Sequence, residues 1–228
     1  MDPGTDRAAL QAATIGALAR VWIAFETSLA GVPLIDKLNR GKLRRDDYLR
    51  LLVNLRQQVI EGGRWIARAA SSFDARFAEL RSRFIRHAAA EHRDYLMLEA
   101  DCLAAGGDVQ AMRAAPKNIG SEALSGWMFH CAGQPNPVGL LGAMFVIEGL
   151  GQRLAAGWAA AIRGQLRLPE AAVTFLAYHG AGDAAHMEQF GAALALAVAS
   201  DDDAAAIVKT AKVTARLYRL QLEEIDNA

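Results

Sequence analysis

Cysteine is scarce in this 228-residue sequence, and net charge is absent. The two cysteines, Cys102 and Cys131, are far apart and form no C-x-x-C pair, which argues against a disulfide framework and favours a reducing cytoplasm. Lys and Arg together number 25, as do Asp and Glu, so the net charge is zero. Nucleic-acid-binding domains usually carry a clustered basic excess, so no nucleic-acid partner is expected.

Long apolar runs and strand patterns are missing as well. The first residues contain no basic segment followed by an apolar one, so a signal peptide is not expected. No stretch of 18 residues is apolar without charges, so we expect no membrane partner. Valine and isoleucine are scattered, with no alternating run between turn residues that would indicate a strand.

What the chain does have is helical periodicity and many good helix formers, notably Ala, Leu, Arg and Glu. The pattern predicts one all-α domain over residues 1–228, a helical bundle of about seven helices. Gly62 and Gly63 fall inside the second helix and should kink it or admit another backbone. Ser121 is the expected cap of the fourth helix. The predicted helices cover about 6–29, 46–71, 75–105, 121–131, 137–163, a segment opening at 169–170, and 201–225.

The candidate chemistry centres on histidine, of which the chain has only five. His179, Asp183 and His186 follow i, i+4, i+7 spacing on the predicted helix that opens at 169–170. This spacing directs two imidazoles and a carboxylate to one side of a helix. Such donors suit iron, manganese or zinc, so the helix is interpreted as half of a metal site.

Glu148 is a second candidate ligand. It lies in the middle of an apolar helix, where an unpaired carboxylate is costly. Gly142, Gly149 and Gly151 around it would let a neighbouring helix approach closely. The alternative interpretation is a salt bridge, for which Arg153 is the candidate partner.

The third predicted helix adds a third group of candidates. His87, Glu91, Asp94 and Tyr95 share one face at 100° per residue, whereas His92 points away from it. The alternative is a solvated surface with i,i+4 pairs. With His87 or Asp94 completing the set, the acids and histidines of the three segments make six donors, a number that fits two iron or two manganese ions.

These residues together resemble a known superfamily. Residues 38–43 and 47–52, then Glu91, Glu148 and the His179-x3-Asp183-x2-His186 element, are similar to haem-oxygenase-like proteins, a group that includes TenA and PqqC. The ligand pattern resembles the non-haem diiron oxidase and oxygenase branch, and the likeness runs from the first helix to about residue 190. It implies a seven-helix fold, two irons, and O2-dependent oxidation of a small organic substrate of amino-acid or fatty-acid type.

The resemblance also sets limits. The family usually has a histidine shortly after its first ligand glutamate, and here Asp94 or His87 would take that place. No histidine precedes residue 87, so haem oxygenase activity is not expected, and neither cysteine has the setting of a thiaminase nucleophile. Family members are often dimeric, so a cytoplasmic homodimer is expected.

Two roles and one competing class complete the sequence-based hypotheses. Tyr95 and Tyr178 neighbour proposed ligands and would orient them by hydrogen bonds, although core tyrosines fit equally well. Arg56, Gln57, Gln58 and Arg64 are candidates for contact with a substrate carboxylate. The competing class is a metal-free TenA- or PqqC-like protein that binds a small ligand, or acts as a cofactorless oxidase, in the same cavity.

Overall fold

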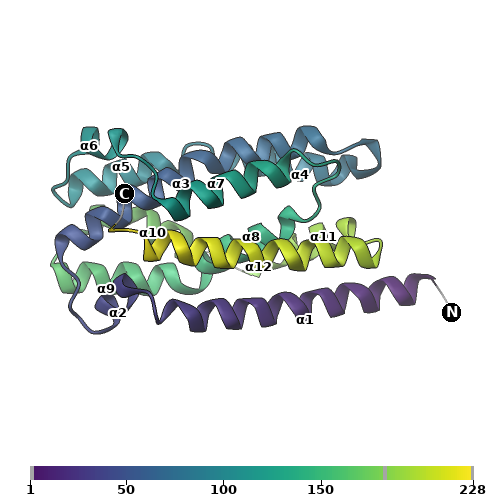
Figure 1. The fold of residues 1–228 in the computed structure, drawn as a ribbon, viewed down its shortest axis with the longest axis horizontal. Coiled ribbons are helices and arrows are strands. Elements are labelled where there is room, and N and C mark those ends of the chain that lie inside the picture. The colour runs from purple at the N-terminus through teal and green to yellow at the C-terminus, as the bar shows by residue number, and fades with distance from the viewer. Residues whose placement is uncertain (1–2, 182–183, 227–228) are drawn as a thin grey trace.

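Helices joined by short connections make up residues 3–181 and 184–226, the part of the chain that this computed structural model describes; side chains are described for 6–181 and 189–226 (Figure 1). No strand occurs in these ranges, which confirms the predicted all-α class. The α-helices are α1 (Pro3–Leu29), α2 (Pro33–Asn39), α3 (Arg45–Ser72), α4 (Ala78–Glu91), α5 (Tyr95–Ala104), α6 (Val109–Ala114), α7 (Ile119–Ala132), α8 (Leu140–Leu150), α9 (Ala156–Leu166), α10 (Thr174–Gly180), α11 (Ala184–Ala197) and α12 (Asp201–Glu223). Shorter turns are η1 (Ala75–Phe77), the π-helical η2 (Gly151–Ala155) and η3 (Glu170–Ala172).

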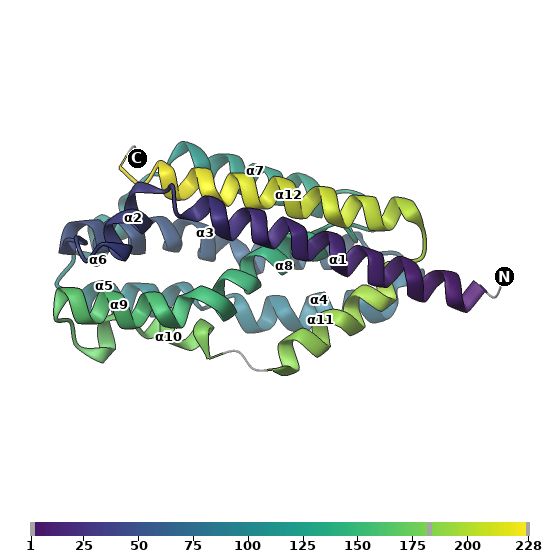
Figure 2. The same ribbon diagram turned by 90° about the horizontal axis from the view of Figure 1, so that it is seen from below.

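The core forms where the long helices lie along one another. Helix α12 packs against α1, α7 and α8, and α3 packs against α4, α5 and α7 (Figures 1 and 2). Trp22, Tyr48, Phe84 and Leu124 are among the large side chains that this packing buries completely. Each such side chain contributes about 1.5–3 kcal/mol relative to an exposed position, so the apolar periodicity is sufficient to fix these helices.

Helix α1 is the most apolar of the long helices. Asp6–Leu29 is long and apolar enough to cross a membrane by length and composition alone. One face of it, which includes Leu18, Trp22 and Phe25, is buried in the core against α12 and α8. Only 28% of its apolar window is buried, so one face of α1 packs on the bundle and the rest of the helix is on the surface.

The predicted helix over 75–105 is wrong as a continuous element, because the chain turns at 92–94. Helix α4 ends at Glu91 and α5 begins at Tyr95. Between them the backbone changes to three-residue hydrogen bonds, with Asp94 N donating to Glu91 O and Met97 N donating to Asp94 O. Helix propensity favours continuity here, and the packing of α4 and α5 on α3 overrides it.

The predicted continuous helix through His179, Asp183 and His186 is also wrong. Helix α10 ends at Gly180, Ala181 lies in a turn, and α11 begins at Ala184. Two glycines, Gly180 and Gly182, stand between the histidines, and glycine costs a helix about 1 kcal/mol at each position. The i, i+4, i+7 geometry therefore does not apply to this motif.

Other boundaries differ less. The helix predicted over 137–163 begins at Leu140 and reaches Leu166, with the π-helical turn η2 in its middle. The cap of α7 is Asn118, whose side chain accepts from Ser121 N, so the prediction of Ser121 as the cap is wrong. Helices α2 and α6 were not predicted; Val32 and Pro33 start the first, and the Asp108 side chain caps the second.

Gly63 is where α3 meets the turn between α4 and α5, as the sequence predicted for one of the two glycines. A Cβ at Gly63 would lie 2.8 Å from Cα and Cβ of His92, whereas a Cβ at Gly62 would meet nothing within 4 Å. The missing side chain at Gly63 thus lets the turn that carries Asp94 sit directly on α3.

Gly63→Ala should therefore destabilise the protein by about 1–3 kcal/mol, because the His92 turn must move away from α3. Gly62→Ala is the matched control and should be neutral or stabilising by up to about 1 kcal/mol, since alanine favours the helix. Urea denaturation of both variants checks this. Equal stabilities for the two variants would contradict the close contact.

Candidate metal centre

Three side chains from two separate segments converge at the junction of α4, α5 and α10. Potential ligand atoms of Glu91, Asp94 and His179 all lie within 4.8 Å of one another. Asp94 Oδ2 is 3.3 Å from His179 Nε2, and all three side chains are partly buried. Two carboxylates and an imidazole at this spacing can share one cation.

A second histidine–carboxylate pair lies beside the first. His87 Nε2 is 3.3 Å from Glu148 Oε1, which joins α4 to α8. His87 and Glu91 are one turn apart on α4, so their side chains project to the same side of that helix. Glu91 is also close enough to Glu148 for that carboxylate to raise its pKa. Glu91 therefore stands between the two pairs.

The electrostatics of these carboxylates indicate a deficit of positive charge. The pKa of Glu91 rises from 4.5 to about 7, first because the side chain is buried and then because Asp94 and Glu148 are close. Burial raises the pKa of Glu148 to about 7 as well. Burial also raises the pKa of Asp94, against a lowering by His92 and by a hydrogen bond with Glu91. Such carboxylates must take up protons or bind a cation.

Asp101 holds His179 in place from a distance. This buried carboxylate on α5 accepts hydrogen bonds from Thr174 N (2.9 Å), Thr174 Oγ1 (2.5 Å) and Phe175 N (3.0 Å), and so caps the start of α10. Tyr48 Oη donates to Ala172 O just before that helix. Since α5 begins next to Asp94, one helix positions both Asp94 and the helix that ends with His179. Sequence reasoning missed Asp101, because its partners are more than 70 residues away.

Helix α8 brings Glu148 to the site just before its π-helical turn. Turn η2 begins three residues after Glu148 and packs against α10. A Cβ at Gly151 in this turn would lie 3.4 Å from Cβ of His179. Single π-helical turns often occur at functional sites, where they reorient the side chains around them.

The remaining predicted residues have varied positions. Asp183 lies outside the described residues, as does the side chain of His186, whose backbone belongs to α11. Tyr178 is 65% exposed and its ring meets the His179 ring edge-on. The Tyr95 ring lies under the Arg56 guanidinium, and His92 is exposed with Nδ1 2.8 Å from Ala89 O. The ligand roles of the metal set and the orienting roles of the tyrosines stay predictions.

Comparison with known proteins decides the family. The family model described as iron-containing redox enzyme matches residues 64–219, which include all five histidines. The chain belongs to the iron-containing redox enzyme family. No curated protein matches its sequence.

Solved structures similar to this iron-containing redox enzyme family member confirm the haem-oxygenase-like fold. A domain of unknown function with a heme oxygenase-like fold from Shewanella denitrificans OS217 has a TM-score of 0.83 at 19% identity, covering 91% of this chain and 89% of that one. A TenA homolog from Pseudomonas syringae pv. tomato DC3000 has a TM-score of 0.73 at 17% identity, covering 95% of this chain and 93% of that one. A TenA homologue from P. horikoshii OT3 has a TM-score of 0.68 at 12% identity, covering 93% of this chain and 97% of that one.

The residues of this family member fit iron. Carboxylate oxygens and imidazole nitrogens are donors that divalent iron and manganese accept. Burial is the main cause of the raised pKa values of Glu91 and Glu148, so a bound cation would favour the ionised form of both carboxyl groups. Glu91, Asp94 and His179 would hold one ion, and His87 with Glu148 would contribute to a second.

The metal-free protein should lose stability as the pH rises from about 4.5 to above 7. Between these values the folded state keeps protons on Glu91 and Glu148, whose pKa values are about 7, while the same groups in the unfolded chain have ionised. The folded state thus binds more protons, and its stability falls with rising pH. Thermal melts in EDTA from pH 5 to 8 measure this, and Glu91→Gln should show a shallower decline. If the melting temperature of Glu91→Gln falls with pH as steeply as that of the wild type, Glu91 is not a source of the pH dependence.

Asp101→Ala should destabilise the protein by about 2–4 kcal/mol, because it leaves a buried helix start without its cap and three donors without an acceptor. Asp108→Ala is the control, since Asp108 is the exposed N-cap residue of α6 and accepts from two backbone N–H groups of its own helix, and it should cost only about 1 kcal/mol. Chemical denaturation gives both values. If Asp101→Ala lowers the free energy of unfolding no more than Asp108→Ala does, the hydrogen bonds of Asp101 to the start of α10 contribute little to stability.

Proposed function

We propose that this protein binds two iron ions and uses O2 to oxidise a small organic substrate of amino-acid or fatty-acid type. The observation that carries the proposal is the position of Glu91 between the Asp94–His179 pair and the His87–Glu148 pair. Asp183 and His186 would extend the donor set from the segment that follows α10. Family membership supports iron as the metal, with manganese as the alternative.

Each group of residues has a defined task in this proposal. When bound, iron supplies the electrons and open coordination positions that O2 activation requires. His87 and His179 bind as neutral imidazoles, and Glu91 and Glu148 give up the protons that burial otherwise holds on them. Metal affinity should therefore increase with pH up to about 7 and above.

A metal-free, TenA-like ligand-binding protein is the second candidate. It is favoured by the likeness to two TenA homologues and by the direct contacts of His87 with Glu148 and His179 with Asp94. In that case the histidines satisfy the carboxylates without an ion, and a carboxyl group with a pKa near 7 can donate or accept a proton. The homodimer and the cytoplasmic location stay predictions for both candidates.

Iron analysis separates the candidates. Protein loaded anaerobically with Fe(II) and desalted should contain about two irons per chain by ICP-MS, and its absorbance should change on exposure to O2. His179→Ala should lose at least one iron while keeping its helical circular dichroism, because this residue supplies a nitrogen ligand.

His92→Ala is the matched control for that measurement. His92 lies in the adjacent turn but is exposed, and it should keep the wild-type iron content. Wild-type protein without iron after loading would favour the metal-free candidate. Full stoichiometry in His179→Ala would remove His179 from the ligand set.

A further inference from the structure

A buried ion-pair cluster joins α3 to α5, the helix that begins directly after Asp94. Arg56 of α3 and Glu99 of α5 are only 7% and 5% exposed, and Arg56 Nε donates to Glu99 Oε1 at 2.8 Å. Arg113 of α6 donates to both oxygens of the same carboxylate from a half-exposed position. The sequence predicted Arg56 as a contact for a substrate carboxylate, but the carboxylate that it binds belongs to the protein itself.

Two guanidinium groups share one carboxylate in this cluster. Hydrogen bonds from Arg113, and less strongly from Arg56, lower the pKa of Glu99, and burial opposes them. Glu99 is therefore ionised, and either arginine alone would still give it a partner. If the cluster served only to compensate Glu99, Arg113 should matter at least as much as Arg56, because it donates two of the three hydrogen bonds.

Arg56 also contacts the first residue of α5. Its guanidinium carbon lies 5.6 Å from the centre of the Tyr95 ring, within the range of a cation–π contact. Tyr95 and Glu99 are four residues apart and lie on the same side of α5, so one side chain of α3 holds both. Tyr95 follows Asp94, whose backbone O accepts from Met97 N at 3.0 Å in the first turn of α5. The contact of Arg56 therefore reaches the turn that carries Asp94.

Helix α3 meets this turn at a second point. Gly63 lies seven residues after Arg56, two turns along the same face of α3, and a Cβ there would be 2.8 Å from Cα of His92. Asp94 lies in the chain between His92 and Tyr95, the two residues that α3 contacts. With α3 holding the turn on both sides, Asp94 Oδ2 is 3.3 Å from His179 Nε2.

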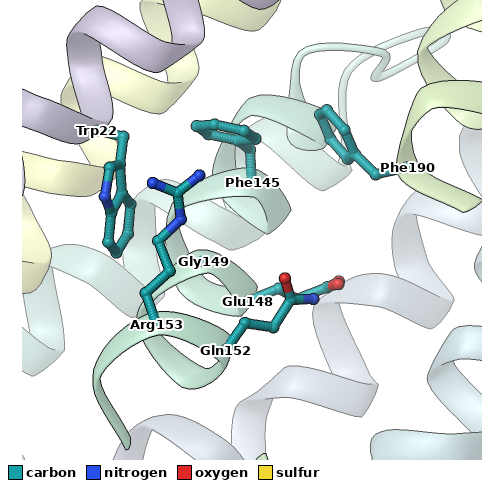
Figure 3. Close-up of a pocket in the computed structure, with 7 residues that line it drawn as sticks. All are labelled: Trp22, Phe145, Glu148, Gly149, Gln152, Arg153 and Phe190. Carbon is teal, nitrogen blue, oxygen red and sulfur yellow. The ribbon is translucent and has the colours of Figure 1, made fainter. Parts of the chain in front are cut away.

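Arg153 provides a comparison, because it also lies over an aromatic ring near the site. Its guanidinium carbon is 5.0 Å from the centre of the Trp22 ring, and Figure 3 shows it extending between Trp22 and Phe145 in the pocket that Glu148 also lines. Arg153 belongs to η2 and Trp22 to α1, so this contact does not join α3 to α5. Removal of Arg153 would take a positive charge from the neighbourhood of a proposed ligand without loosening the turn at 92–94.

We propose that Arg56 is a positioning residue of the metal centre: stacked on Tyr95 and paired with Glu99, it holds the start of α5, and with it Asp94, against α3. Charge alone predicts the opposite effect on metal affinity, because removal of one cation strengthens the binding of another. A weaker metal affinity without Arg56 is therefore an effect of position. The effect on metal affinity rests on the proposed function, whereas the effect on the turn does not.

The first measurement is the Mn(II) affinity of metal-stripped protein, from the signal of free Mn(II) in EPR spectroscopy. Arg56→Met should bind Mn(II) about tenfold more weakly than the wild type, a loss typical of residues that orient a ligand. Arg113→Met is the matched control, because it removes a guanidinium and two hydrogen bonds from the same Glu99, and it should stay within about twofold. Arg153→Met controls for charge and should bind Mn(II) at least as tightly as the wild type.

The second measurement is amide hydrogen exchange over residues 92–97 in metal-free protein, by mass spectrometry and relative to peptides of α12. Arg56→Met should exchange about tenfold faster there, and Arg113→Met should stay within about twofold, because the turn depends on the contact with Arg56. Tyr95→Leu removes the ring but keeps the Arg56–Glu99 pair, and should reproduce the effect of Arg56→Met in both measurements. The double variant should be no worse than either single one, since both remove the same contact.

Two results would overturn the proposal. The first is an Mn(II) affinity of Arg56→Met that equals or exceeds that of the wild type. The second is exchange over residues 92–97 that is no faster in Arg56→Met than in Arg113→Met. If Arg56→Met does not fold, Tyr95→Leu decides by the same two criteria. Wild-type protein that binds no Mn(II) would count against the proposed function, and hydrogen exchange would then decide whether Arg56 places the turn.

Discussion

The site depends on three acids that share too little positive charge. Glu91, Asp94 and Glu148 come together where α4, α5 and α8 meet, and no lysine or arginine is ion-paired with any of them in the described chain. In a poorly solvated site, carboxylates that repel one another must be compensated. The histidines offer partial compensation, and a divalent ion offers more. Binding of a cation at these acids would therefore stabilise the folded protein.

The sequence was sufficient for the fold class and for much of the grouping of acids and histidines. Apolar periodicity identifies the long helices because burial of their faces dominates the free energy of folding. The same periodicity places His87 and Glu91 on one face of α4, and the structure finds them beside Glu148 and the Asp94–His179 pair. These are local regularities, so a single sequence reveals them.

What the sequence did not reveal depends on contacts between distant segments. The turn at 92–94 exists where α3 presents Gly63, about 30 residues earlier, and the start of α10 depends on Asp101. Arg153 was considered as a partner of Glu148, but in the described residues its guanidinium lies over the Trp22 ring, and His87 is the residue beside Glu148. Local patterns contain no information on such approaches, and backbone propensity predicts the opposite at 92–94.

The end of α10 at Gly180 has a consequence for how the protein is assembled. His179 lies in the last turn of α10 and His186 belongs to α11, so the two histidines are on separate helices. Helix α11 packs on α4 and α8, whereas α10 packs on α5 and α9. An ion bound by both histidines would link α10 to α11, and through them the helices on which each of the two packs. Loss of the ion would remove that link, so α10 and α11 would move more independently of each other.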